Sequence, residues 1–181
     1  MKLKSIILAI AFVCFAQVNA QDQASSQKNN EPTASQIMKK AYKEAKKSNK
    51  KVLLMFHASW CGWCKRMDKQ MQDPAVKEYF DRSFVTTHLT VMESPKNKHL
   101  ENKGAMDIMK KFKADKGGIP FWVIFNKRGK ALEESRDDKG SNLGCPASEP
   151  EVAKFLEILK NTTKMTQKEA DAVAKVFTIK R

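Results

Sequence analysis

The stretch VLLMFHASWCGWCK, residues 52–65, decides the fold of this chain. The apolar residues 52–56 predict a buried strand, and two cysteines separated by two residues follow where the strand ends and a helix begins. A helix N-terminus carries partial positive charge and free backbone N–H groups, so it stabilises a thiolate on Cys61. The spacing keeps Cys64 on the same helical face, close enough to form a disulfide with Cys61. The pattern therefore predicts a redox-active dithiol.

Two other interpretations of the cysteine pair are half of a zinc site and a structural disulfide. A zinc site needs a second ligand pair, and the sequence has no other Cys-x-x-Cys pair and no His-x-His pair. The position of the pair at a helix start favours redox chemistry over a structural role. We expect neither a metal nor a cofactor.

A second motif, GGIPFWVIF at residues 117–125, precedes the turn NKRGK at residues 126–130. Together with the Cys-x-x-Cys pair, this motif makes residues 35–160 resemble a thioredoxin-fold protein. Trp60, the Gly62-Trp63 dipeptide and the Gly-Ile-Pro-Phe-Trp run resemble the extracytoplasmic branch, which includes the C-terminal domain of DsbD-type reductases. The resemblance implies an α/β thioredoxin fold, in which helices flank a central mixed sheet of four to five strands.

The resemblance also implies roles for the site residues. Cys61 would be the attacking thiolate and Cys64, one turn deeper, the resolving thiol, with the Cys61 sulfur exposed. Ile119-Pro120 would form a cis-proline loop that faces the dithiol and offers backbone hydrogen bonds to a substrate strand. The residues expected to contact substrate are Trp60, Gly62, Trp63, Ile119 and Pro120.

The strand before the dithiol departs from the family at Met55. Thioredoxins carry a buried carboxylate there that helps to deprotonate the resolving cysteine, and a methionine cannot do this. His57 lies two residues on and therefore on the same strand face, so it is a candidate for proton transfer. It is equally compatible with a packed side chain, and solvent is the remaining proton acceptor.

The N-terminus is typical of an export signal. Lys2 and Lys4 precede an apolar core at residues 6–16, and small residues up to Ala20 predict cleavage before Gln21. An uncleaved anchor is the alternative. We expect a signal peptide at residues 1–20, a flexible leader at 21–33 and one thioredoxin-like domain at 34–181, in the periplasm or secreted.

The periodicity also predicts the order of elements, including a further C-terminal helix beyond the minimal fold. In order, we expect a helix capped by Thr33, a strand at 51–57, a helix at 61–71 that continues at 75–80, and a strand at 84–91. An insertion or an ordered loop at 92–104 follows, then a helix at 105–113, a hairpin of 121–125 with 131–135, and helices capped by Ser148 and Thr166.

These features favour an exported thiol:disulfide oxidoreductase that reduces disulfides in other exported proteins. Trp63 adds no positive charge beside the thiolate, and this favours a reductant over an oxidant. Expected partners are protein disulfides and an upstream thiol donor, which could be embedded in a membrane. We expect a monomer that binds no nucleic acid despite the net charge of +14, because export separates the chain from nucleic acid.

Three alternatives remain open at this point. The first is a disulfide oxidase or isomerase of the same fold. The second is a copper-handling protein, which would use two thiolates with one of the three histidines, His57, His88 and His99. The third is a binding module whose dithiol is incidental. Cys145, outside both motifs, is a free, half-buried thiol, a thiol in a disulfide with a partner or a second copy, or a regulatory thiol.

Overall fold

A computed structural model describes residues 31–179. The predicted signal peptide and most of the predicted leader lie outside the described residues. In the part of the chain that is described, no helix is both long and apolar enough to cross a membrane.

A four-stranded mixed sheet forms the centre of the described unit. Its strands are β1 (Lys51–His57), β2 (Phe84–Thr90), β3 (Phe121–Phe125) and β4 (Ala131–Glu134), in the spatial order β2-β1-β3-β4. β1 pairs with β2 in parallel, and the β1–β3 and β3–β4 pairs are antiparallel. Parallel neighbours need a crossover, which the helices between β1 and β2 supply. The predicted α/β architecture with a mixed sheet is confirmed, at four strands.

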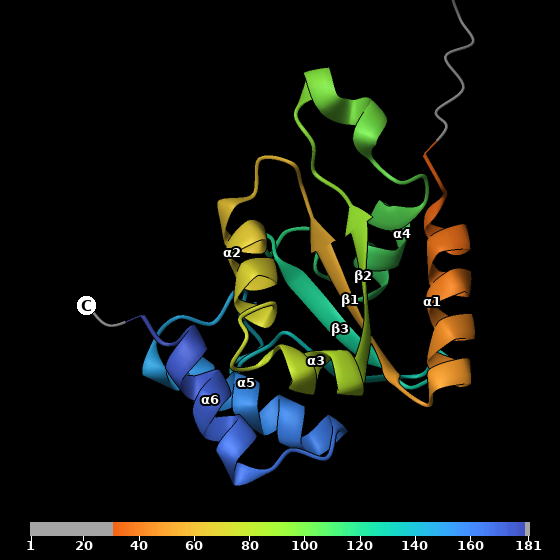
Figure 1. Cartoon of the computed structure of the whole chain (residues 1–181). Coiled ribbons are helices and arrows are strands. Elements are labelled where there is room, and N and C mark those ends of the chain that lie inside the picture. Colours follow the sequence, from red (N-terminus) through yellow and green to blue (C-terminus); the bar gives the residue numbers. More distant parts are fainter. Residues whose placement is uncertain (1–30, 180–181) are drawn as a thin grey trace, which may run out of the picture. The chain divides into compact units, whose positions relative to one another are not determined.

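Helices cover both faces of the sheet (Figure 1). One face carries α1 (Ala34–Ser48) and α4 (Ala105–Lys111), and the other carries α2 (Gly62–Met71), α3 (Lys77–Ser83), α5 (Glu149–Thr162) and α6 (Gln167–Phe177). Because strand residues alternate between faces, β1 feeds two cores: Leu54 and Phe56 pack towards α1, while Leu53 and Met55 pack towards α2. Near-continuous apolar sequence in β1 and β3 follows from burial on both sides.

The helix starts agree with the capping patterns in the sequence. Capping boxes led by Thr33, Ser148 and Thr166 open α1, α5 and α6. Several predicted boundaries are off by one to three residues; α3, for example, begins at Lys77, not at Ala75, and ends at Ser83, not at Phe80. The carboxylate of Asp73 accepts a hydrogen bond from the Ala75 N–H at 2.9 Å, which stabilises a turn in place of helix.

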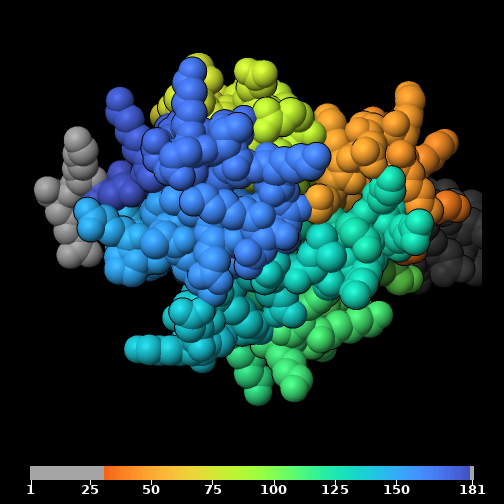
Figure 2. All heavy atoms as spheres, turned by 90° about the horizontal axis from the view of Figure 1, so that it is seen from below, coloured from red at the N-terminus to blue at the C-terminus, as the bar shows by residue number. Residues whose placement is uncertain are grey.

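The additional helix α6 packs against the side of the domain that holds α2. The Phe177 ring of α6 lies 5.0 Å from that of Phe155 in α5, and the buried Gln70 amide of α2 donates to the Val176 carbonyl at 2.9 Å. Seen from the end opposite the N-terminus of α2, α5 and α6 lie beside α3 (Figure 2). The C-terminal helix therefore supports the active-site helix from its far end.

Candidate active site

The two cysteines of residues 60–65 are joined at the N-terminus of α2. Cys61 and Cys64 form a disulfide with their Cα atoms 5.3 Å apart. Cys61 is the N-cap of the helix, and its sulfur accepts a hydrogen bond from the Cys64 backbone N–H at 3.1 Å. This N–H and the helix dipole would both stabilise negative charge on the Cys61 sulfur after reduction.

The disulfide is less exposed than the sequence suggested. Cys61 is 3 % exposed and Cys64 1 %, so the expectation of an exposed Cys61 sulfur is wrong for the oxidised state. Both cysteines belong to a small apolar cluster with Ala58, and Ile119 packs against it. The burial comes from tertiary contact with a distant loop, which the local helix position does not reveal.

Two exposed tryptophans flank the disulfide. Trp60 is 58 % exposed, yet its indole Nε1 donates to the Met92 carbonyl at 2.8 Å. Trp63 is 51 % exposed and lies under the Arg66 guanidinium, 5.7 Å from the ring centroid. Gly62 between them is open to solvent, since an added Cβ would meet nothing within 4 Å. The site thus presents apolar aromatic surface whose orientation is set by polar contacts.

The Ile119-Pro120 loop lies against the disulfide. Its peptide bond is cis, and the Ile119 carbonyl oxygen is 3.7 Å from the Cys61 sulfur. The loop therefore faces the two cysteines, as we expected from the sequence.

The strand position at which thioredoxins carry a buried acid holds no carboxylate. Met55 is 1 % exposed in the apolar core, and its neighbour across the sheet is His88 on β2. His57 is half-buried, and its Nε2 lies 3.2 Å from the Thr90 hydroxyl. Burial lowers the pKa of His57, and the nearby His88 lowers it further, against the opposing charges of Asp68 and Glu93. His57 is therefore neutral at neutral pH and able to accept a proton.

A histidine–carboxylate pair adjoins His57. The His57 and His88 rings lie 5.0 Å apart between centroids, and His88 Nε2 is 2.9 Å from the Asp68 carboxylate of α2. Among the described residues, no hydrogen bond joins His57 to either cysteine, and no group of three or more His, Cys, Asp or Glu side chains could hold a metal.

Glu93 is a buried carboxylate beside the site that was not among the residues predicted from the sequence. Glu93 is 6 % exposed, and it accepts hydrogen bonds from the Ser59 N–H at 2.5 Å and the Ser59 hydroxyl at 2.8 Å. It belongs to the insertion that we expected only to be ordered, which contains the 3₁₀ helix η1 (Pro95–Leu100). The Met92 carbonyl of the same insertion accepts the hydrogen bond from the Trp60 indole. The insertion therefore fixes both Ser59 and Trp60, the two residues that precede Cys61. A local sequence pattern gives no signal for this contact across 34 positions.

Cys145 lies away from the disulfide and is buried as a free thiol. Its sulfur contacts the Gln70 side-chain oxygen at 3.3 Å, and burial raises the pKa of the thiol to about 11. Of the predicted roles, the free thiol agrees with these contacts, but the side chain is buried and not half-buried as predicted.

A family model described as thioredoxin-like matches residues 33–127. No curated protein sequence matches the chain. Among solved structures, the chain is similar to a disulphide isomerase from Xylella fastidiosa Temecula1, with 23 % identity, a TM-score of 0.46 and coverage of 77 % of this chain and 87 % of that one. It is also similar to the oxidised C-terminal domain of DsbD from Neisseria meningitidis, with 20 % identity, a TM-score of 0.40 and coverage of 57 % and 82 %. It is similar as well to a thioredoxin from Thermus thermophilus, with 21 % identity, a TM-score of 0.42 and coverage of 66 % of this chain and 79 % of that one.

Proposed function

Since this chain belongs to the thioredoxin-like family, we propose that it is a thiol:disulfide oxidoreductase that works chiefly as a reductant of disulfides in other exported proteins. The observation that carries the proposal is the Cys61–Cys64 disulfide at the start of α2, with the Cys64 N–H directed at the Cys61 sulfur.

The reaction follows from that geometry. In the reduced protein, the Cys61 thiolate attacks one sulfur of a substrate disulfide, forms a mixed disulfide and releases the other substrate sulfur as a thiolate. Cys64 then loses its proton and attacks the Cys61 sulfur, which re-forms the Cys61–Cys64 disulfide and releases the second substrate thiolate. The dithiol has given two electrons to the substrate, and an upstream dithiol donor must restore them.

Two features support the reducing direction and the exported setting. Trp63, between the cysteines, adds no positive charge that would stabilise the thiolate, so the disulfide form is favoured and the dithiol is the better reductant. The apolar core at residues 6–16, with small residues up to Ala20, is typical of a cleaved export signal. Disulfides in other exported proteins are the substrates that such a location supplies.

Insulin reduction by the wild type and by Cys61→Ser tests the activity, and the equilibrium with glutathione gives its direction. We expect the wild type to reduce insulin, Cys61→Ser to be inactive, and the reduction potential to lie below that of the glutathione couple. An inactive wild type would refute the enzymatic role in favour of a binding module. A potential well above glutathione would instead indicate a disulfide oxidase.

A further inference from the structure

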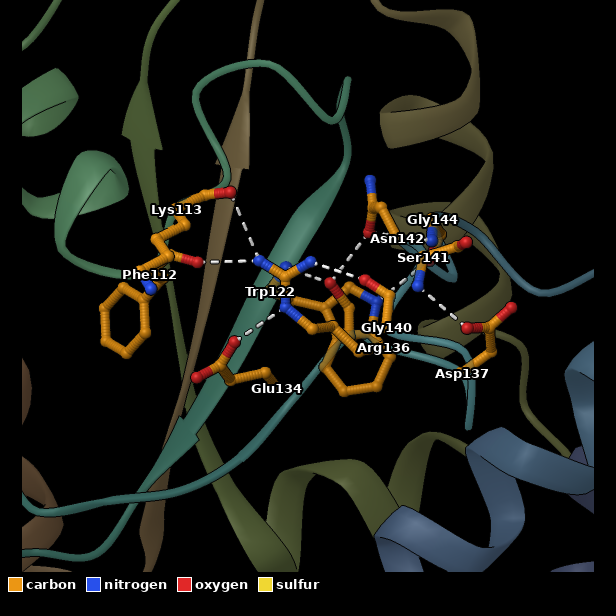
Figure 3. Close-up of polar contacts among 11 residues, drawn as sticks. Phe112, Lys113, Trp122, Glu134, Arg136, Asp137, Gly140, Ser141, Asn142 and Gly144 are labelled. Atoms are coloured by element: carbon orange, nitrogen blue, oxygen red, sulfur yellow. Dashed lines mark hydrogen bonds and ion pairs between the residues drawn. The ribbon is translucent and has the colours of Figure 1, made fainter.

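Side chains of the segment after β4 form hydrogen bonds with the backbone before β3, where the chain leads into the loop at residues 117–120 (Figure 3). The Arg136 guanidinium donates to the carbonyls of Phe112 at 2.6 Å and Lys113 at 3.3 Å, and it pairs with Glu134 at 3.0 Å. These carbonyls end α4, where the chain turns towards the loop at residues 117–120. Arg136 therefore fixes the backbone at residues 112 and 113, a few residues before the loop.

Asn142, from the same segment, binds the loop itself. Its Nδ2 lies 3.2 Å from the Gly117 carbonyl, 3.1 Å from that of Gly118 and 3.0 Å from that of Pro120. Its Oδ1 accepts hydrogen bonds from the Ser135 hydroxyl at 2.9 Å and the Gly144 N–H at 3.1 Å. The opposite orientation of the amide would set an oxygen against three carbonyl oxygens, so the donor side is committed to the loop.

Asn142 leaves one carbonyl of the loop available. The carbonyls of residues 117, 118 and 120 share the amide N–H groups, whereas the Ile119 carbonyl has only the 3.7 Å contact to the Cys61 sulfur among the described residues. That carbonyl is a main-chain acceptor beside the reacting sulfur, and an extended substrate segment could donate an N–H to it.

We propose that Asn142 is a positioning residue, which holds the loop so that the Ile119 carbonyl can bind the main chain of a polypeptide substrate. This inference rests on the proposed function, whose substrates are disulfides within polypeptides, and it adds Asn142 as the residue that positions the substrate-binding loop. Asn142 touches no reacting atom and acts through the loop.

The test compares Asn142→Ala and Asn142→Asp with the wild type on two substrates. The aspartate keeps an oxygen for Ser135 and Gly144 but replaces the donor with an oxygen that repels the loop carbonyls. For insulin, we expect kcat/KM to fall about tenfold or more in both variants, mainly through KM, as for loss of a substrate hydrogen bond. For 5,5′-dithiobis(2-nitrobenzoate), which has no peptide main chain, we expect rates within about twofold of the wild type. The glutathione equilibrium should not change.

The matched control is Asn126→Ala. Asn126 also orders a turn, by accepting from the Arg128 and Lys130 N–H groups, but it lies at the opposite end of β3 from the loop. This variant should keep wild-type activity on both substrates, and circular dichroism should show all variants folded.

Wild-type insulin kinetics in both Asn142 variants would overturn the proposal. Equal losses on both substrates would also overturn it, because they would indicate damage to the dithiol, and so would failure of both variants to fold. If the wild type proves to be an oxidant, the reducing function fails separately. The Asn142 contrast should then persist for oxidation of reduced polypeptide.

Discussion

Replacement of Glu93 by Gln tests whether the insertion holds the chain that leads into the dithiol. Glu93 is buried, and its two carboxylate oxygens accept one hydrogen bond each from the N–H and the hydroxyl of Ser59. Glutamine has nearly the same shape but only one acceptor oxygen. With the glutamine oxygen facing the Ser59 N–H, its NH₂ group faces the Ser59 hydroxyl, which must then accept instead of donate, and neither bond has a charged partner any longer.

The size of the effect follows from the loss of the charge in both bonds. A hydrogen bond to a charged group contributes about 1.5–3 kcal/mol net and a neutral one about 0.5–1.5 kcal/mol, so weakening both bonds in Glu93→Gln should lower the free energy of unfolding by about 2 kcal/mol. For a domain of this size that corresponds to a fall in melting temperature of roughly 4–8 °C. Because Ser59 adjoins Trp60, kcat/KM for insulin should fall as well.

Thermal and urea unfolding of the oxidised protein measure the effect, with Glu44→Gln as the control. Glu44 is an exposed glutamate of α1, and its replacement should change stability by less than about 0.5 kcal/mol. A Glu93→Gln variant that melts within about 1 °C of the wild type would refute the reasoning. The insertion would then rest against the site without holding it.

Four further outcomes are expected. Cys64→Ala should trap substrates on Cys61 as mixed disulfides on non-reducing gels, and adducts with Cys61→Ala instead would reverse the two roles. Trp63→His should raise the reduction potential by stabilising the thiolate, and an unchanged glutathione equilibrium would show that residue 63 does not act on the sulfur. Cys145, with its pKa raised by burial to about 11, should resist thiol reagents at about pH 8 until the protein unfolds, as mass spectrometry of labelled protein would show. Because burial lowers the pKa of His57, the unfolded state binds its proton more readily, so stability should fall as pH drops below about 6.5. Urea unfolding at two pH values should show a weaker fall in His57→Phe, and an equal fall would assign the pH dependence to other groups.

The parts of the fold that follow from local chemistry were predictable. Thr33, Ser148 and Thr166 each cap a helix whose third residue returns the hydrogen bond, and that exchange is written within four residues of sequence. The Cys-x-x-Cys spacing likewise places both sulfurs at one helix start without reference to the rest of the chain.

The parts that depend on contacts between distant segments were not predictable. Glu93 and Asn142 stand in polar, loop-like sequence, where a carboxylate or amide is ordinarily solvated. Their roles arise because β2 brings Glu93 beside Ser59 and because the chain after β4 returns Asn142 to the loop before β3. The burial of Cys61 has the same origin, since Ile119 covers it from 58 positions away.

These contacts also determine which group can accept the proton of Cys64. Met55 offers no acceptor. His57, although neutral, bonds to Thr90 and lies edge-on to His88, without a hydrogen bond to either sulfur among the described residues. A base must lie within hydrogen-bond reach of the proton it takes, directly or through one water. In the oxidised state His57 is bonded to Thr90 and only adjoins the His88–Asp68 pair. Direct transfer from Cys64 would require the imidazole to come within hydrogen-bond reach of the thiol when the disulfide opens. Without that movement the proton must pass to solvent, and resolution would then depend on how freely water reaches the buried Cys64.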